Sequence, residues 1–525
     1  MNDSVCDPVL TCADSSSFED DFFAGNEEKE WKIMNQVGNA IGDALLRDMR
    51  ELRSIPPRPR FLALVGKGHN GGDALLGLRR LLKTIPTARA VVWPLREWKS
   101  GRPNLIRARA ELMESANQRV QEISPISEMN HSENIRKVWE ERVGEGGFEA
   151  TLEGILGMQA KLPLKSPLLE WIRMLNEDSR LGVRVSVDMP TGVGEDETVD
   201  AFKAHFTYCT GIVKTPVLVP KNQNWVGRLR YLEVGFFNHS SNVFSPDRGE
   251  RVLKPNALRT LRGLRPVPSD KRSNGHLLLL AGSRNFAGAA MMAAQGALKA
   301  GVGLLSVCIP ESLHSSFSAQ RPEAMWIPMP ETPEGGLALE GLGKVRSLLG
   351  KVSAVAAGPG LGREPETLSL VRETLSHFSG RALLDADALQ TELLNKIAQT
   401  KRLVLTPHAG EYQRISQGQS PLEYAEEKEC VLVLKGSHTR IFFSGILHHC
   451  LGGSSLLARG GSGDLLAGIL GALLAKNQFD ALTCSLLGVQ WHGRAAEILA
   501  RQKGQESVYA TEILDYLSFA LRNDF

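Results

Sequence analysis

The sequence predicts an α/β protein with two domains on one chain, and three observations support this. The chain has 525 residues, which is too many for one ordinary domain. Short apolar runs alternate with amphipathic helical patterns, an order typical of parallel sheets covered by helices. Glycine-rich loops come before helical patterns in both halves, near residue 66 and again near residue 460.

Composition limits the classes of partner. The 61 basic and 59 acidic residues leave a net charge of +2, which gives no general attraction for nucleic acid or membranes. Seven cysteines without a CxxC pair argue against a disulfide framework and a zinc site. We find no basic start with an apolar stretch and no run of 18 apolar residues. We therefore expect a soluble cytoplasmic protein with neither nucleic-acid nor membrane partners.

The first half has the pattern of one α/β domain. Residues 1–29 are polar and acidic, and we expect a flexible N-terminus there. Residues 30–245 form the first expected domain, which opens with a helix whose apolar face starts at Trp31. The segment "FLALVGKGHNGGDALLGLRRLL" then reads as strand, glycine loop and helix, and "ARAVVWPL" as the next strand. Such a βαβ unit implies a parallel sheet. Later strands are expected at "VRVSVDMP", "HFTYCT" and residues 229–234.

The second half restarts the same architecture after a basic, proline-bearing linker. We expect the linker and the second domain to share residues 246–525. The strand "HLLLLAG", the helix "AGAAMMAAQGALKAG" and the strand "LLSVCIP" follow the linker, and alternation continues to "WHGRAAEILA". No repeat at a fixed period connects the two halves.

The glycine loop of the first half admits two interpretations. Gly66, Gly68 and Gly71 satisfy GxGxxG between a strand and a helix, as in dinucleotide-binding domains. A hydride-transferring dehydrogenase also needs an acidic residue about twenty positions on, and the next strand offers none. Asp73 reads as a helix cap or a site residue. Asp188, after a buried strand, reads as a turn residue or a ligand-binding residue.

Four motifs carry a resemblance in this half: residues 33–38, "HNGGDA" at 69–74, "EGILG" at 153–157 and "DMPTG" at 188–192. In order and content they are similar to the NAD(P)H-hydrate epimerase domain, the YjeF N-terminal family, which implies a Rossmann-like three-layer αβα fold. The resemblance assigns proton transfer to Asp188 and a potassium site to Asn70, Glu153 and Thr191. It also assigns substrate binding to His69, Asn70, Gly71, Gly72, Asp73 and Gly157. Glu153 stands where the family motif has Asp, and Thr191 where it has Ser.

The stretch "LARGGSGDLLAGIL" predicts an anion site with a base beside it. Gly460, Gly461 and Gly463 let the chain turn tightly and present N–H groups at the start of a helix, where phosphate oxygens bind. Asp464 can take a proton from a hydroxyl that attacks phosphorus. A helix cap is the alternative for Asp464, but it leaves the glycines unexplained. After the strand "CVLVL", Lys435, Gly436, Ser437, His438 and Thr439 can supply an ammonium, a close backbone and hydroxyls to a nucleotide.

Seven motifs in order, from "LLLLAGSRNFAGA" to "LARGGSGDLLAGILGALLA", resemble the NAD(P)H-hydrate dehydratase domain, whose fold is ribokinase-like αβα. The resemblance implies that ADP or ATP, with Mg²⁺, phosphorylates the carbon-6 hydroxyl of hydrated NADH or NADPH, after which phosphate leaves. It assigns nucleotide contacts to Lys435–Thr439, Gly461 and Gly463, and catalysis to Asp464. Substrate contacts fall on Ala289, Gly360, Gly362, His408, Glu411 and Arg414. Asp385 and Asp387 in "LLDADAL" are alternatives for orienting magnesium or a polar network.

The sequence thus predicts a metabolite-repair enzyme whose epimerase domain supplies its dehydratase with the S form of the hydrate. Two alternatives stay open: a ribokinase-like kinase for a small alcohol such as a thiazole or pyridoxal, and a dehydratase joined to a non-catalytic N-terminal binding module. We also expect a homo-oligomer.

Overall fold

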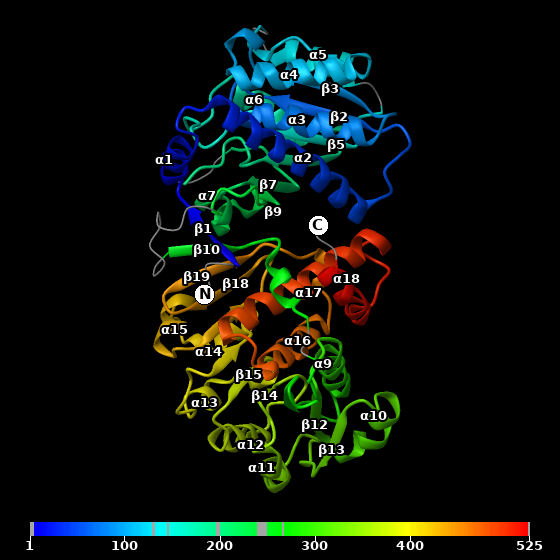
Figure 1. The fold of residues 1–525 in the computed structure, drawn as a ribbon, viewed down its shortest axis with the longest axis vertical. Helices are drawn as coiled ribbons and strands as arrows, with labels where there is room; N and C mark the ends of the chain where they lie inside the picture. The colour runs from blue at the N-terminus through cyan, green and yellow to red at the C-terminus, as the bar shows by residue number, and fades with distance from the viewer. Residues whose placement is uncertain are drawn as a thin grey trace. The chain divides into compact units, whose positions relative to one another are not determined.

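The computed structural model describes residues 5–128, 132–143, 146–195, 200–238, 249–264 and 267–522. The chain separates into two compact units, Pro8–Phe244 and Ser245–Phe525, the latter together with Met1–Asp7. The expected boundary near residue 245 lies outside the described residues. Both units are α/β, as the sequence predicts (Figure 1). Among the described residues, no helix is long and apolar enough to cross a membrane.

The first unit is built on a parallel seven-stranded sheet of order β4-β3-β2-β5-β6-β7-β9. Alternate residues of β2 enter two separate cores, Phe61 and Ala63 on one face and Leu62 and Leu64 on the other, which makes three layers. The strands are β2 (Arg60–Val65), β3 (Arg89–Pro94), β4 (Val120–Glu122), β5 (Ala150–Gly154), β6 (Val183–Val187), β7 (Phe206–Thr210) and β9 (Arg228–Leu232).

Helices cover both faces of this sheet. On the face of Phe61, α2 (Glu27–Leu52), α3 (His69–Thr84) and α4 (Pro103–Ala116) pack their apolar sides. On the face of Leu62, α5 (Ser132–Val143) and α6 (Leu168–Glu177) contribute Trp139 and Trp171. The short helices α7 (Thr215–Leu218) and α8 (Gln223–Val226) follow β8 (Val213–Lys214).

The expectation of a flexible N-terminus is wrong for the part of residues 1–29 that the structure describes. Residues from Val5 onward form β1 (Cys6–Leu10) and α1 (Cys12–Phe23), and β1 pairs with β8. Helix α1 is held by its aromatic residues, since Phe18 and Phe22 pack against Phe236. These phenylalanines lie at helical spacing within an acidic segment, whose composition concealed the apolar face.

The second unit contains a larger sheet with strands in the order β13-β12-β11-β14-β15-β16-β17-β18-β19-β10. Pairing is parallel except where β18 meets β17 and β19. Its strands are β10 (Gly249–Leu253), β11 (His276–Leu280), β12 (Leu304–Pro310), β13 (Met325–Met329), β14 (Ala354–Ala357), β15 (Arg381–Leu384), β16 (Leu403–Leu405), β17 (Val431–Leu434), β18 (Thr439–Phe443) and β19 (Ile446–Cys450). Strand β10 lies in the segment expected as a linker.

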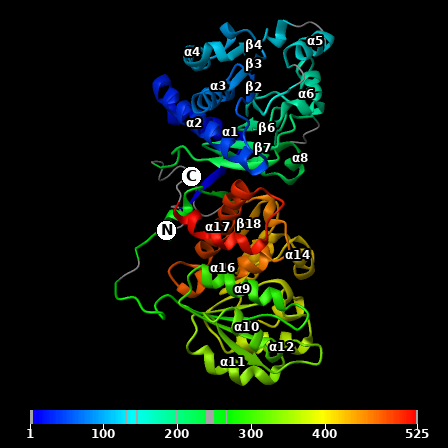
Figure 2. The same cartoon turned by 90° about the vertical axis from the view of Figure 1, so that its right-hand side faces the viewer.

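Helices again cover both faces (Figure 2). One core takes Leu277 and Leu279 of β11 together with α9, α16 and α17, and the other takes Leu278 and Leu280 with α11 and α12. The helices are α9 (Ala287–Lys299), α10 (His314–Gln320), α11 (Leu342–Leu349), α12 (Pro365–Ser376), α13 (Thr391–Leu394), α14 (Ala409–Ser416), α15 (Pro421–Glu427), α16 (Ser462–Lys476), α17 (Ala481–Lys503) and α18 (Leu517–Arg522).

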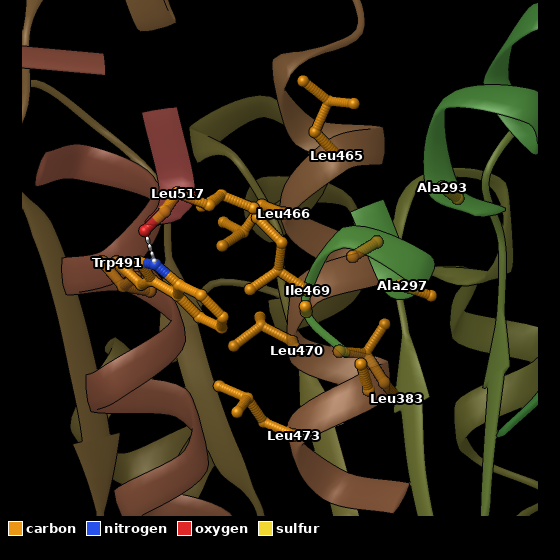
Figure 3. Close-up of a cluster of buried hydrophobic side chains, with 14 of the residues drawn as sticks. Ala293, Ala297, Leu383, Leu465, Leu466, Ile469, Leu470, Leu473, Trp491 and Leu517 are labelled. Carbon is orange, nitrogen blue, oxygen red and sulfur yellow. Dashed lines mark hydrogen bonds between the residues drawn. The ribbon is translucent and has the colours of Figure 1, made fainter. Parts of the chain in front are cut away.

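Helix α16 is the central helix of the first of these cores. Its leucines pack between α9, which presents the small side chains of Ala293 and Ala297, and Trp491 of α17 (Figure 3). The Trp491 indole N–H donates to the Leu517 carbonyl at 2.7 Å. Small side chains on α9 allow a close approach, and the buried tryptophan is satisfied, so α16 is held firmly on both sides. This packing fixes the helix that carries Asp464.

Candidate active sites

A cavity of about 590 Å³ lies in the first unit, where the loops after β2, β5 and β6 meet at the carboxyl ends of the strands. Parallel α/β sheets bind ligands at this edge. Five of the residues predicted from the sequence line the cavity: His69, Asn70, Asp73, Gly157 and Asp188. Gly71 and Gly72 are buried in the first turn of α3, and they, Glu153 and Thr191 lie outside the lining.

Asp188 has an unusual backbone conformation and is paired with a buried lysine. Its φ is +68°, which is rare for a residue other than glycine. The Lys214 ammonium donates to Asp188 Oδ1 at 2.7 Å, and both side chains are buried. Burial alone would lower the pKa of Lys214, but Asp188 and Glu19 raise it above its ordinary value. Lys214 was not predicted, and its one signal was a charge within the apolar run "GIVKTPV".

Asp73 presents a second carboxyl group to the same cavity. It is 6% exposed, and its Oδ1 has no hydrogen-bond partner among the described residues. Burial, and then the charges of Asp188 and Glu19, raise the pKa of Asp73 well above its usual range. A carboxyl group with a raised pKa therefore lies in one cavity with the lysine-paired Asp188, an arrangement that can supply an acid and a base.

Two charged side chains that the sequence did not suggest, Glu30 and Arg102, contact His69 in the lining of the cavity. His69 Nε2 lies 2.5 Å from Glu30 Oε1 and 2.9 Å from Arg102 Nη1. The hydrogen bond from His69 lowers the pKa of Glu30. Glu19 of α1 also lines the cavity and lies 3.9 Å from Lys214 Nζ. The N-terminal helix thus contributes to the site.

The three residues expected to bind potassium are brought close together. Glu153, at the end of β5, accepts a hydrogen bond from the Thr191 hydroxyl at 2.6 Å. The Asn70 side-chain amide donates to the carbonyl of Val187 at 3.0 Å, at the end of β6. Asn70 thus joins α3 to the end of β6, and Glu153 joins the end of β5 to Thr191.

In the second unit, Asp464 lies in the first turn of α16, as the sequence predicts. Gly461 precedes the helix with φ +87°, a conformation that other residues seldom adopt. Burial first, and then the neighbouring Asp385, raise the pKa of Asp464 to about 6, with Lys435 opposing the shift. A base with this pKa is suited to proton transfer near neutral pH.

Lys435 follows β17 and bonds to carboxylates. Its ammonium donates to Asp385 Oδ1 at 2.8 Å and lies 3.8 Å from Glu411 Oε2. Asp385 also accepts from the Thr406 hydroxyl at 2.7 Å, which settles its place in a polar network. Asp387 instead accepts from the Gly362 N–H at 3.1 Å and from Arg363.

The other site residues predicted for this unit lie in different surroundings, some hydrogen-bonded to the backbone, some exposed and some buried. His408 and Glu411 form a capping box at the start of α14, with His408 Nδ1 accepting from the backbone. Arg414 donates to the Leu389 carbonyl. In the turn before β18, Gly436 and Ser437 are exposed, whereas burial lowers the pKa of His438 to about 4. Thr439 begins β18, and Gly463 is partly buried in the first turn of α16.

The loop after β14 is fitted against the start of α9. A Cβ at Gly360 would lie 2.8 Å from the Ala289 Cβ and 2.5 Å from the Phe286 carbonyl oxygen. A Cβ at Gly362 would meet nothing within 4 Å. The structure therefore brings Ala289 and Gly360 into contact, while Gly362 stays open on its side-chain face.

Comparisons with known proteins agree with this division of the chain. Residues 31–216 match the family model described as YjeF-related protein N-terminus, and residues 277–518 match that of NAD(P)H-hydrate dehydratase. A bifunctional NAD(P)H-hydrate repair enzyme of Gloeobacter violaceus is 36% identical, with 84% of each chain covered. One of Moorella thermoacetica is 30% identical, with 88% of each covered. The solved ADP/ATP-dependent NAD(P)H-hydrate dehydratase of Bacillus subtilis is 29% identical over 51% of this chain and 96% of that one, with a TM-score of 0.44.

Proposed function

The chain belongs to the family of bifunctional NAD(P)H-hydrate repair enzymes, and from that premise we propose that it restores hydrated NADH and NADPH through two sites of its own. The second unit dehydrates the S form of the hydrate at the expense of ADP or ATP. The observation that carries this is Asp464, a base in the first turn of α16 with a pKa of about 6.

The dehydration follows from the chemistry of the hydrate. Its ring carries a hydroxyl on carbon 6, and hydroxide is a poor leaving group. Asp464 takes the hydroxyl proton while the oxygen attacks the terminal phosphorus of the nucleotide, and the bond from that phosphorus to the bridging oxygen breaks. N–H groups at the start of α16 face the transferred phosphoryl group. The ring nitrogen lone pair then expels phosphate, and loss of a ring proton restores the reduced nicotinamide.

The nucleotide contacts are proposed for the two glycine-bearing turns. Gly461 and Gly463 supply close backbone approach at α16, and Gly436 and Ser437 do so in the exposed turn before β18. Asp385 or Asp387, whose charges both act on Asp464, would orient Mg²⁺, which would neutralise phosphate charge there.

We propose that the cavity of the first unit epimerises the hydrate. A carbon that bears both a hydroxyl and a ring nitrogen inverts by reversible bond breaking, either by ring opening or by loss of water. Both routes require one group that gives a proton and one that takes it. Asp73, whose pKa burial raises, can give the proton, and Asp188, paired with Lys214, can take it. Lys214 acts as a positioning residue because its ammonium donates a hydrogen bond to Asp188 Oδ1.

We propose that the protein works in the reducing cytoplasm, since its described cysteines form no disulfide bond. The kinase alternative loses support because the chain matches both domain models and bifunctional relatives over most of its length. The homo-oligomer stays a prediction.

The direct test of the dehydratase assignment uses purified protein, S-form NADH hydrate, and Mg²⁺ with ADP or ATP. We expect near-ultraviolet absorbance of NADH to return with wild type and to slow by about 10²–10⁴-fold in Asp464→Asn, the usual loss on removing a general base. Asp480→Asn, which changes the N-cap of α17, is the matched control. Return at the wild-type rate in Asp464→Asn would refute the role of Asp464.

A further inference from the structure

The carboxylate of Glu153 is completely occupied by groups of the chain itself. Glu153 is fully buried at the end of β5. Its Oε1 accepts from the Ile155 N–H at 2.9 Å and the Thr191 hydroxyl at 2.6 Å. Its Oε2 accepts from the Ser186 hydroxyl at 2.8 Å and the Thr191 N–H at 3.2 Å. A carboxylate offers about four acceptor positions, so none remains for a cation.

The other two expected ligands also hydrogen-bond to groups of the chain itself. The Thr191 hydroxyl, which donates to Glu153, also accepts from the Leu156 N–H at 2.9 Å. Asn70 directs its amide nitrogen, not its oxygen, toward the carbonyls of Leu156 and Val187, at 3.3 and 3.0 Å. Potassium sites in proteins are built from oxygen atoms that converge on the ion. Here N–H and O–H donors hold the oxygens of Glu153 and Thr191, and Asn70 turns its amide nitrogen to the neighbouring carbonyls, so the residues present do not fit the ion.

We infer that the epimerase site of this protein works without potassium, because Glu153 and Thr191 hydrogen-bond to each other, and Asn70 to the Leu156 and Val187 carbonyls, where the family motif implies a cation. The part of this inference that concerns catalysis rests on the proposed epimerase function, whereas the part that concerns ion binding does not. The difference from the family lies in Glu153, whose side chain is one methylene longer than the Asp of the motif. The longer side chain places its carboxylate against Thr191 and Ser186 together.

The cluster ties together the elements that build the cavity. Asn70 belongs to α3, Glu153 to β5 and Ser186 to β6, and Thr191 follows the strand that leads to Asp188. The hydrogen bonds of Glu153 with Ser186 and Thr191, and those of Asn70 with the Leu156 and Val187 carbonyls, therefore fix the end of β6 against α3 and β5. Buried polar networks have this rigidity when every member is satisfied.

The experiment compares KCl with NaCl at equal ionic strength in the full-length protein, with two readouts. The first is the thermal unfolding temperature, which rises when an ion binds only the folded state. The second is the rate at which R and S hydrates interconvert without nucleotide. For wild type we expect the same unfolding temperature and the same rate in both salts. For Glu153→Asp, whose shorter side chain frees carboxylate oxygen, we expect a rise of both in KCl.

Thr191→Ser is the matched control, since it keeps the hydroxyl that serves Glu153, and it should remain indifferent to potassium. A potassium-specific rise in unfolding temperature or rate for wild type would overturn the inference. If Glu153→Asp is also indifferent, the role of the methylene is overturned, and if that variant fails to fold, the wild-type comparison decides alone. A wild type that epimerises in neither salt would refute the epimerase assignment, while the thermal comparison would still decide the question of the cation.

Discussion

At the scale of single residues, the chemistry depends on carboxyl groups whose surroundings set them apart. Asp464 is buried near Asp385 and opposed by Lys435, and Asp73 is buried near Asp188. Sequence spacing identified these aspartates as candidates because each sits at the start of a helix or the end of a strand. It could not identify Lys214 or Glu19, because their roles depend on contacts between segments that are distant along the chain.

Replacing Asp464 should stabilise the fold. Folding raises the pKa of Asp464 from 3.8 to about 6, so the folded protein binds this proton more tightly than the unfolded chain. The resulting penalty grows as pH rises from about 4 to 6 and is complete above pH 6. Asp464→Asn removes the ionisation, and at pH 8 we expect a gain of at most about 3 kcal/mol in the free energy of unfolding. Denaturant unfolding at pH 8 and pH 4 tests this, since the gain should vanish at the lower pH.

The same pKa predicts the acid limb of the dehydratase. The base is competent when ionised, so kcat/KM should decline below about pH 6 as Asp464 becomes protonated. We expect a slope approaching tenfold per pH unit, measured with the S-form hydrate and saturating nucleotide. An unchanged rate down to pH 5 would show that the proton goes elsewhere.

Substitutions test the roles of Asp73 as the acid and Asp188 as the base of the cavity. Asp188→Asn and Asp73→Asn should each slow interconversion of R and S hydrates by about 10²–10⁴-fold, because each removes one proton carrier. Asp20→Asn is the matched control, since Asp20 lines the same cavity but is exposed. Proton nuclear magnetic resonance of the two hydrates follows the interconversion directly. Equal rates in Asp73→Asn and Asp20→Asn would remove Asp73 from the mechanism.

At the scale of elements, regular strands and helices were well predicted and the terminal segment was not. The strand, glycine loop and helix around residues 61–84 are confirmed as β2 and α3. The stretch "LARGGSGDLLAGIL" is confirmed as the start of α16. The N-terminal helix α1 was missed because acidic composition dominates that segment, and its order depends on Phe236, more than two hundred residues away. The details of the Glu153 cluster also required the structure, since they depend on three separate elements.

Two glycines in the loop after β14 test how closely this loop packs against the start of α9. Gly360 and Gly362 both have positive φ, so alanine strains the backbone at either position. Only at Gly360 would the new Cβ approach the Phe286 carbonyl and Ala289. We expect Gly360→Ala to cost about 1–3 kcal/mol more than Gly362→Ala in the free energy of unfolding, the usual range for overpacking. Equal losses by denaturant unfolding would mean that this contact contributes nothing.

At the scale of the whole molecule, two complete α/β units each carry their own candidate site. Each has a core on both faces of its sheet, and each site lies within one unit. Two such units were predictable because the patterns of strand, loop and helix restart after the basic segment. The assignment of residues 5–7 to the second unit was not, because it depends on contacts such as the 3.1 Å pair between Asp7 and Lys254.

If one chain carries both activities, it should restore NADH from both hydrates, so the first experiment uses a mixture of R and S NADH hydrates with nucleotide and Mg²⁺. The return of NADH absorbance is measured to its end point for wild type, Asp188→Asn and Asp464→Asn. We expect wild type to recover all of the NADH, Asp188→Asn to slow markedly once the S form is consumed, and Asp464→Asn to recover almost none. A wild type that stops at the S fraction would contradict the account, because it would leave the first unit without its activity.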